Sequence, residues 1–280
     1  MLNSFFECGG PYETADFVLF GAPFDSTASF RSGARFASGT MRNESIGLES
    51  YSPVLDKDLE DISYHDAGEL TLCIGEAQTA LRQVEDFTAP LLLDHKRPVM
   101  IGGEHLVTLG ALRAVHKQYP DLHVVHFDAH ADLRDDYLGA TLSHATVMRR
   151  AWELLGDGRI HQFGIRSGER GEFAWAEKKH VHMHKFNFVG LAETVQALHG
   201  KPVYLTLDLD VLDPSILPGT GAPEPGGVDF HALMHALRLL APLRVVGFDI
   251  VELSPPCDRS GASTAVACKL LREMLLLYGG

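Results

Sequence analysis

Hydrophobic residues along the chain form short apolar runs that alternate with longer amphipathic stretches. The runs are rich in β-branched and aromatic residues, which predicts eight strands, at residues 17–22, 62–66, 99–101, 123–127, 160–164, 181–184, 203–207 and 245–248. The amphipathic stretches predict helices at residues 75–93, 106–119, 144–155, 191–198, 230–240 and 263–277. This alternation is typical of repeated βα units. Several runs are apolar enough to be covered on both faces, as the strands of parallel sheets are.

We expect one domain over residues 1–280, because no stretch reads as an interdomain linker. The Gly/Pro-rich segment 217–227 is short and lies directly between a predicted strand and a predicted helix. In parallel α/β sheets, ligands bind beyond the carboxyl ends of the strands. Polar clusters that directly follow a predicted strand are therefore the candidate sites.

Composition narrows the class of protein. The 24 basic and 37 acidic residues give a formal net charge of −13, which disfavours nucleic acid and anionic membranes as partners. The four cysteines include no C-x-x-C pair, so we expect neither a zinc ribbon nor a thioredoxin-type redox site. Without a signal-like N-terminus or a run of 18 apolar residues, the expectation is a cytoplasmic protein without a membrane segment.

Carboxylate and imidazole side chains follow the strand predicted at residues 123–127. The sequence HFDAHAD places Asp128, His130 and Asp132 at alternate positions, so an extended backbone directs all three to one face. Converging groups of this kind repel one another or stay unsatisfied unless a cation joins them. The alternative is a solvated loop that leaves the charges in water.

Two further strand ends repeat the pattern. Asp208 and Asp210 end the strand predicted at residues 203–207, again on one face. His105 follows the strand at residues 99–101 after Gly102 and Gly103, which would let the backbone and a metal approach closely. Taken alone, His105 would more often be a plain residue at the start of a helix.

The combined donor set favours two metal ions. Six side chains are more than one tetrahedral zinc needs, and none is a thiolate: His105, Asp128, His130, Asp132, Asp208 and Asp210. A pair of Mn²⁺ ions suits mixed carboxylate and imidazole ligands better than zinc. A two-metal centre lowers the pKa of a water molecule so that it can act as a nucleophile at neutral pH.

Three ordered motifs resemble those of the ureohydrolases, the family of arginase, agmatinase and relatives. The family carries Gly-Gly-Glu/Asp-His, Asp-Ala-His-x-Asp, and Asp-x-Asp-x-x-Asp-Pro followed by Pro-Gly-Thr-Gly. This chain has these motifs at residues 102–105, 128–132, 208–214 and 218–221. The resemblance runs from about residue 21 to the final predicted helix. It implies a three-layer α/β/α fold with a central, mostly parallel eight-stranded sheet, a dimanganese cluster, and hydrolysis of a guanidinium group to urea.

The resemblance also implies a role for each site residue. All six residues named above would ligate metal, and Asp128 and Asp208 would bridge the two ions. Asp132 would relay a proton to the departing amine, and His144 would shuttle protons at the site mouth, a task suited to an exposed histidine with a pKa near neutrality. Glu252 would hold the substrate guanidinium, because a carboxylate pairs with a planar guanidinium in a bidentate manner. A helix-start position is the alternative reading of His144.

The segments 21–27, 31–36, 48–52 and 222–227 are similar to the agmatinase branch of the family. Arginases have an asparagine that clamps the amino-acid end of arginine at the position of Arg134. The expected substrate is therefore agmatine, a dication that an acidic chain attracts, with putrescine and urea as products and polyamine biosynthesis as the role. Arg134 either points away from the far amine, or the substrate carries a carboxylate, as guanidinobutyrate does. Arginine, guanidine and formiminoglutamate are further alternatives.

Two alternative hypotheses for the function remain. A zinc deacetylase on the same fold binds one zinc through Asp-x-His and a lone aspartate, whereas His105, Asp132 and Asp208 beside the other ligands favour two metals. A non-catalytic binding protein would be expected to have lost a ligand or Glu252. The family usually forms trimers or hexamers, so a homo-oligomer is expected.

Two further groups of residues are candidates for a binding site. Residues 218–221 are expected to line the pocket, with Glu224 either a partner for the far amine or part of a simple turn. The histidines at 180, 182 and 184 alternate on a predicted strand, but lysines flank them and no carboxylate is near. We expect them to be surface-exposed or buried and neutral rather than a metal site.

Overall fold

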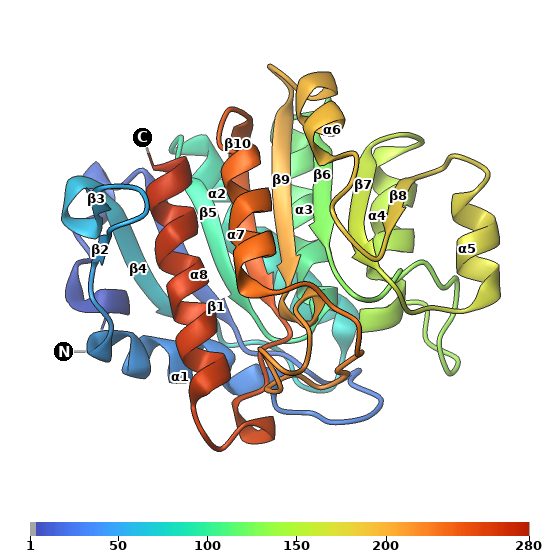
Figure 1. Ribbon diagram of the computed structural model, residues 1–280, viewed down its shortest axis with the longest axis horizontal. Coiled ribbons are helices and arrows are strands. Elements are labelled where there is room, and N and C mark those ends of the chain that lie inside the picture. The colour runs from blue at the N-terminus through green and yellow to red at the C-terminus, as the bar shows by residue number, and fades with distance from the viewer. Residues whose placement is uncertain (1–3, 280) are drawn as a thin grey trace.

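Eight parallel strands form one sheet at the centre of the molecule. A computed structural model describes residues 4–279 and gives the strand order β4-β1-β5-β10-β9-β6-β7-β8 (Figure 1). Every pairing in this sheet is parallel. The strands are β1 (Phe17–Ala22), β4 (Tyr64–Glu69), β5 (Arg97–Gly102), β6 (His123–Phe127), β7 (Ile160–Ile165), β8 (His182–Lys185), β9 (Pro202–Asp208) and β10 (Arg244–Val251). All eight predicted strands are confirmed: β1 and β6 have the predicted bounds, β5, β7, β9 and β10 are longer, and β4 and β8 are shifted towards the C-terminus.

Helices cover both faces of the sheet, which confirms the three-layer α/β/α architecture (Figure 1). The helices are α1 (Ala37–Glu44), α2 (Ala77–Leu93), α3 (Thr108–Gln118), α4 (Val147–Leu155), α5 (Arg170–Ala176), α6 (Leu191–Ala197), α7 (Phe230–Leu239) and α8 (Ala262–Tyr278). One apolar core lies between the sheet and α1, α6, α7 and α8, and a second lies between the sheet and α2, α3 and α4. Both faces of the central strands are buried, which explains their continuous apolar runs. No helix among residues 4–279 is long and apolar enough to cross a membrane.

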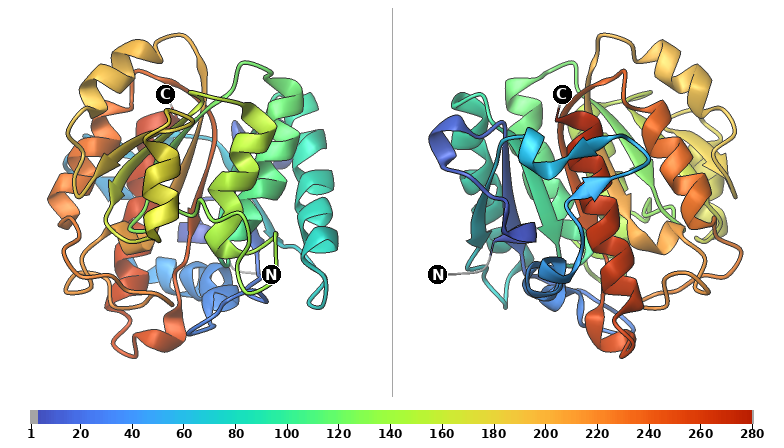
Figure 2. Two further views of the ribbon diagram at one scale, coloured as in Figure 1. Left: turned by 90° about the vertical axis from the view of Figure 1, so that its right-hand side faces the viewer. Right: turned by 60° about the vertical axis from the view of Figure 1, so that its left-hand side comes forward.

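Four elements were not predicted: helices α1 and α5, and the antiparallel strand pair β2 (Tyr51–Ser52) and β3 (Lys57–Asp58). The sequence of α1, ASGTMRNE, is rich in weak helix formers, so its helix depends on packing against α8 rather than on propensity. The small hairpin lies along α8 (Figure 2), where Ser52 donates a 2.7 Å hydrogen bond to Glu273 and Lys57 donates to the carbonyl of Leu276. These contacts join residues that are far apart in the sequence, so a local sequence pattern does not predict them.

The order of the strands brings distant segments together. In the sheet, β5, β10, β9 and β6 are consecutive neighbours, although more than 140 residues separate β5 from β10 along the chain. Because all four strands are parallel, their carboxyl ends lie at one edge, which the arrowhead of β9 marks in Figure 1. The three predicted polar clusters and Glu252 follow these four strands. The fold therefore gathers them at one place.

Candidate metal centre

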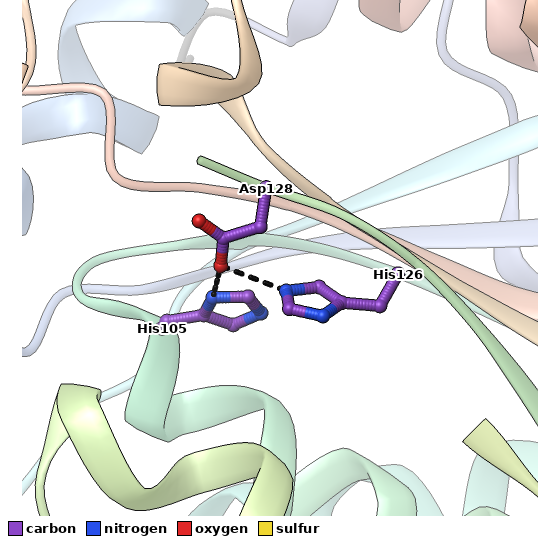
Figure 3. Close-up of side chains that lie close together, drawn as sticks. All are labelled: His105, His126 and Asp128. Atoms are coloured by element: carbon purple, nitrogen blue, oxygen red, sulfur yellow. Dashed lines mark hydrogen bonds and ion pairs between the residues drawn. The ribbon is translucent and has the colours of Figure 1, made fainter. Parts of the chain in front are cut away.

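Asp128 lies at the centre of the carboxyl-end cluster. It directly follows β6, is fully buried, and one of its oxygens, Oδ2, lies 2.7 Å from His126 Nε2 and 3.1 Å from His105 Nδ1 (Figure 3). Burial by itself raises the pKa of Asp128, but the adjacent imidazoles of His126, His105 and His130 lower it well below 3.8. The carboxylate is therefore held ionised in the protein interior.

His105 faces three carboxylates. Its Nδ1 lies 3.1 Å from Asp128 Oδ2, and it lies 3.3 and 3.2 Å from the Oδ2 atoms of Asp132 and Asp208. This nitrogen is buried and makes no aligned hydrogen bond within residues 4–279. Burial disfavours a charged imidazole, yet the three carboxylates raise the pKa of His105 well above 6.5. The three carboxylates therefore stabilise a positive charge next to His105 Nδ1.

His130 forms a second group with Asp210 and the other side of Asp128. Its Nδ1 lies 2.9 Å from Asp210 Oδ2 and 3.6 Å from Asp128 Oδ1, the oxygen that points away from His105. Asp128 thus reaches both groups, one oxygen to each. The structure brings together all six predicted ligand residues: His105, Asp128, His130, Asp132, Asp208 and Asp210.

Backbone geometry fixes these carboxylates in place. Asp210 Oδ1 accepts a hydrogen bond from the Ala129 amide at 3.1 Å, which ties the end of β9 to the end of β6. Asp132 has a φ of +54°, an uncommon left-handed conformation for a residue with a side chain. Gly103 is required because a Cβ there would lie 1.8 Å from the carbonyl oxygen of Phe24. The predicted close approach of the backbone is thus present at Gly103.

The far side of the His105 ring is held by a hydrogen-bond network that the sequence analysis did not predict. His105 Nε2 lies 3.0 Å from Thr206 Oγ1, and Thr206 donates a 2.6 Å hydrogen bond to Asp249. Because the Thr206 hydrogen is used on Asp249, its oxygen accepts from His105 Nε2–H, and a neutral His105 ring then has its lone pair on Nδ1. That lone pair faces three carboxylates, an arrangement that a bound cation completes. The available signal was a lone charged residue, Asp249, inside an apolar strand.

The donor set fits a pair of divalent ions. Two groups of close ligand atoms occur among residues 4–279, His105 with His126 and Asp128, and Asp128 with His130 and Asp210. Burial and the nearby Asp128 raise the pKa of Asp132 to about 7, as expected for crowded carboxylates without a cation. Imidazole nitrogens and carboxylate oxygens without thiolates match the ligand preference of manganese.

A cavity of about 280 Å³ opens onto the cluster. Its inner wall carries metal-centre side chains and Glu252, and its mouth carries Phe30, Arg31, Arg134, Tyr137 and His144. Of residues 218–221, which were predicted to line the pocket, Gly221 does so, together with the following Ala222. Glu224 is not among the lining residues. The proposed contact of Glu224 with the far amine therefore has no support in the geometry.

Glu252 lies at the inner wall in a strained backbone conformation, with a φ of +65°. Its Oε1 accepts a 2.8 Å hydrogen bond from the His105 amide, which fixes the carboxylate beside the metal-ligand cluster. Burial, followed by the charge of Glu104, raises the pKa of Glu252 to about 8. A cationic group that entered the cavity would restore the charged form of this carboxylate.

His144 is half-buried at the mouth rather than exposed. Burial lowers its pKa to about 4, so the expected pKa near neutrality is wrong. Its ring packs edge-on against Tyr137, with 5.5 Å between ring centroids. A neutral imidazole has one nitrogen that can accept a proton and one that can donate. The residue thus keeps the chemistry needed for proton transfer.

Arg134 is paired rather than free. Its Nη1 lies 2.9 Å from Glu169 Oε1, its Nε lies 3.6 Å from the buried carboxylate of Glu172, and its guanidinium lies 4.4 Å from the centre of the Tyr137 ring. Two carboxylates thus offset one cation at the cavity mouth. Arg134 neither points away from the cavity nor stands there as an uncompensated charge.

The three alternating histidines share no site. His182 and His184 lie on the edge strand β8, stacked on His161 and Phe163 respectively, whereas His180 stacks on Trp175. No group of metal-ligating atoms that includes them occurs among residues 4–279. His182 is exposed, and His180 and His184 are partly buried.

Comparison with known proteins gives consistent results. Residues 15–277 match the model of the arginase family. Agmatinase of Bacillus subtilis is 45% identical over 268 residues, 95% of this chain and 92% of the relative, and guanidinobutyrase of Pseudomonas aeruginosa is 34% identical over 280 residues, 96% and 88%. The crystal structure of agmatine ureohydrolase of Thermoplasma volcanium superimposes with a TM-score of 0.90 at 35% identity, covering 99% of this chain and 94% of that one.

Proposed function

This chain belongs to the arginase family, and we propose that it is a ureohydrolase that converts agmatine to putrescine and urea. The observation that carries the proposal is the convergence of two histidines and four aspartates beneath a cavity whose inner wall presents Glu252. Residues 1–280 would act as a single ureohydrolase domain. The role fits polyamine biosynthesis in the cytoplasm, and we expect a homo-oligomer, a trimer or hexamer.

The six clustered residues would hold two Mn²⁺ ions, with His105 on one ion and His130 on the other. Asp128 directs one oxygen to each imidazole and would therefore contact both ions. Asp208 lies beside His105, and its bridging role is the one that the family resemblance implies. When bound, the metal pair supplies a water nucleophile at neutral pH and neutralises charge that develops during hydrolysis. The four negative charges of the carboxylates would balance the four positive charges of two divalent ions. The two imidazoles are neutral ligands.

The residues around the cluster would orient the guanidinium and move protons. Glu252 would bind the guanidinium through two parallel hydrogen bonds, which holds the central carbon beside the cluster. The leaving amine needs a proton, because an amide anion is a very poor leaving group. Asp132, next to the cavity, and His144, at its mouth, are the groups that could deliver it.

The far end of the substrate would lie near Arg134 at the mouth. The pairing of Arg134 with Glu169 and Glu172 leaves this part of the mouth without excess positive charge, which is compatible with the primary ammonium of agmatine.

One observation favours a second candidate substrate, guanidinobutyrate. Arg31 lines the mouth, donates to the carbonyls of Thr220 and Gly221, and has no carboxylate within 4 Å among residues 4–279. A carboxylate at the far end of the substrate could pair with it.

Hydrolysis of a substrate panel tests the proposal, followed as urea release for the guanidino compounds and as formamide release for formiminoglutamate, which carries a formimino group. The panel is agmatine, guanidinobutyrate, arginine, guanidine and formiminoglutamate, each assayed with the enzyme loaded with Mn²⁺ and after chelation. We expect the highest kcat/KM with agmatine and two metal ions per chain by elemental analysis. A preference for arginine would refute the substrate, and one zinc per chain with deacetylase activity would refute the reaction.

A further inference from the structure

Thr27, in the loop after β1, is bound to a buried carboxylate. Its amide donates to Glu104 Oε2 at 2.9 Å and its hydroxyl donates to Glu104 Oε1. Glu104 is 1% exposed, and its own amide donates at 2.7 Å to the carbonyl of Phe24 in the same loop. In the ionised form of Glu104 the hydroxyl hydrogen of Thr27 is committed to this carboxylate, and only oxygen lone pairs are left for other partners.

Those lone pairs face His144. The His144 amide donates to Thr27 Oγ1 at 3.1 Å, and His144 Nδ1 lies 3.4 Å from the same oxygen. An oxygen that can only accept favours a hydrogen on Nδ1, which leaves Nε2 as the nitrogen that takes up a proton and then passes it on. His144 Nε2 lies 3.4 Å from the hydroxyl of Ser29, which is exposed at the cavity mouth.

We propose that Thr27, anchored by Glu104, is a positioning residue that fixes the ring orientation and the tautomer of His144. The chain Glu104–Thr27–His144 joins the loop that carries His105 to the residue at the mouth, so the proton-transfer group is aligned with the metal-ligand cluster. The inference rests on the proposed role of His144 in proton transfer. Thr27 itself does not line the cavity, so it acts through His144 and touches no substrate.

Three substitutions at Thr27 separate positioning from simple support of the loop. Thr27→Val keeps the shape but loses the hydroxyl, Thr27→Ala loses it with a smaller side chain, and Thr27→Ser retains it. We expect Val and Ala to lower kcat about 10- to 100-fold, the scale of a misaligned proton-transfer group, while KM for agmatine changes less than about threefold. Thr27→Ser should recover most of kcat. Two metal ions per chain should be retained in all three.

A matched control carries the same substitution elsewhere. Thr194→Val in α6 removes a hydroxyl that donates to the Gly190 carbonyl, and it should leave kcat unchanged. If Thr27→Val and Thr27→Ala keep near wild-type kcat while folded, as judged by thermal melting, the proposal is wrong. Loss of metal in step with loss of kcat would also overturn it, because Thr27 would then act on the metal centre.

A double-mutant cycle with His144 gives the decisive test. If Thr27 acts only through His144, Thr27→Val should lower kcat little further in the His144→Ala background. Additive losses would show that Thr27 acts by another route and refute the inference alone. If His144→Ala by itself leaves kcat with agmatine intact, the proposed role of His144 fails instead. The two failures are thus distinguishable.

Discussion

Thr206 and Asp249 are directly paired on the neighbouring strands β9 and β10, and Thr206 Oγ1 donates to Asp249 Oδ1 at 2.6 Å. Asp249 is fully buried and also accepts from the hydroxyls of Tyr204 and Thr108, each at 2.9 Å. The same Thr206 oxygen lies 3.0 Å from His105 Nε2. A carboxylate inside an apolar strand therefore orients a histidine of the candidate metal centre, as outer hydrogen-bond partners of metal ligands commonly do.

Replacing Thr206 should weaken one of the two metal sites. Thr206→Val removes the acceptor for His105 Nε2–H, so we expect metal affinity at the His105 side to fall about 10- to 100-fold. The measurement is the metal content after dialysis against graded free Mn²⁺. Thr88→Val, which loses a hydroxyl bonded to Val84 O in α2, serves as the control for a buried hydroxyl. Unchanged occupancy in Thr206→Val would contradict the network.

Replacing His130 should remove the second ion selectively. His130→Ala loses the imidazole of the group formed with Asp128 and Asp210, while the carboxylates around His105 stay in place. We expect about one metal ion per chain and loss of most urea production. Activity near wild type in added Mn²⁺ would show that the two-ion assignment is wrong.

Replacing Glu252 should separate metal binding from turnover. Glu252→Gln retains an oxygen that can accept from the His105 amide but loses the charge that would pair with a guanidinium. The expected result is two ions per chain and a kcat/KM lowered at least about 100-fold, which corresponds to about 3 kcal/mol of transition-state stabilisation. Retained turnover would rule out the guanidinium-binding role.

Releasing Arg134 should alter the preference for the far end of the substrate. Glu169→Gln removes the carboxylate 2.9 Å from Arg134 and leaves only Glu172 at 3.6 Å. We expect the ratio of kcat/KM for guanidinobutyrate to that for agmatine to rise about three- to tenfold, the effect of up to about 1.4 kcal/mol of added attraction. Glu153→Gln, in an Arg–Glu pair on α4, is the matched control. An unchanged ratio would place Arg134 outside substrate selection.

The buried imidazole of His161 should reduce stability in acid. Burial, aided by His182 and His123, lowers the pKa of His161 to about 3, below the 6.5 of an unfolded histidine. Between these values the unfolded chain binds the extra proton, so stability falls as pH falls from about 6.5 toward 3, by about 2 kcal/mol at pH 5 relative to pH 7. His161→Phe should remove this loss, with urea unfolding of both proteins as the measurement.

A neighbouring residue shows that phenylalanine fits at position 161, and an exposed histidine provides a matched control. Phe163 occupies the equivalent place two residues along β7 and stacks on His184, so an aromatic ring without charge fits this row. His199→Gln, at an exposed position, should not change the difference between pH 7 and pH 5. Equal acid sensitivity of wild type and His161→Phe would show that His161 takes up its proton without cost.

Much of the fold and the cluster was predictable because the signals were local. A buried parallel strand is an apolar run whatever its neighbours are, and a ligand site at strand ends leaves polar residues at fixed positions after each run. Asp128, His130 and Asp132 could therefore be grouped by alternation alone. Helix α1 could not be predicted, because its weak helix formers are held by packing against α8.

The sequence by itself determined the βα alternation, the three polar strand ends and the chemistry of their donors, since each depends on residue type and spacing within one short segment. Only the tertiary structure decided which strand ends meet, because the order β5-β10-β9-β6 joins segments more than 100 residues apart. It also decided the neutral state of His144, the pairing of Arg134, and the hydrogen-bond chains through Thr206 and Thr27. These are set by burial and by distances between side chains, which no local pattern of residues contains.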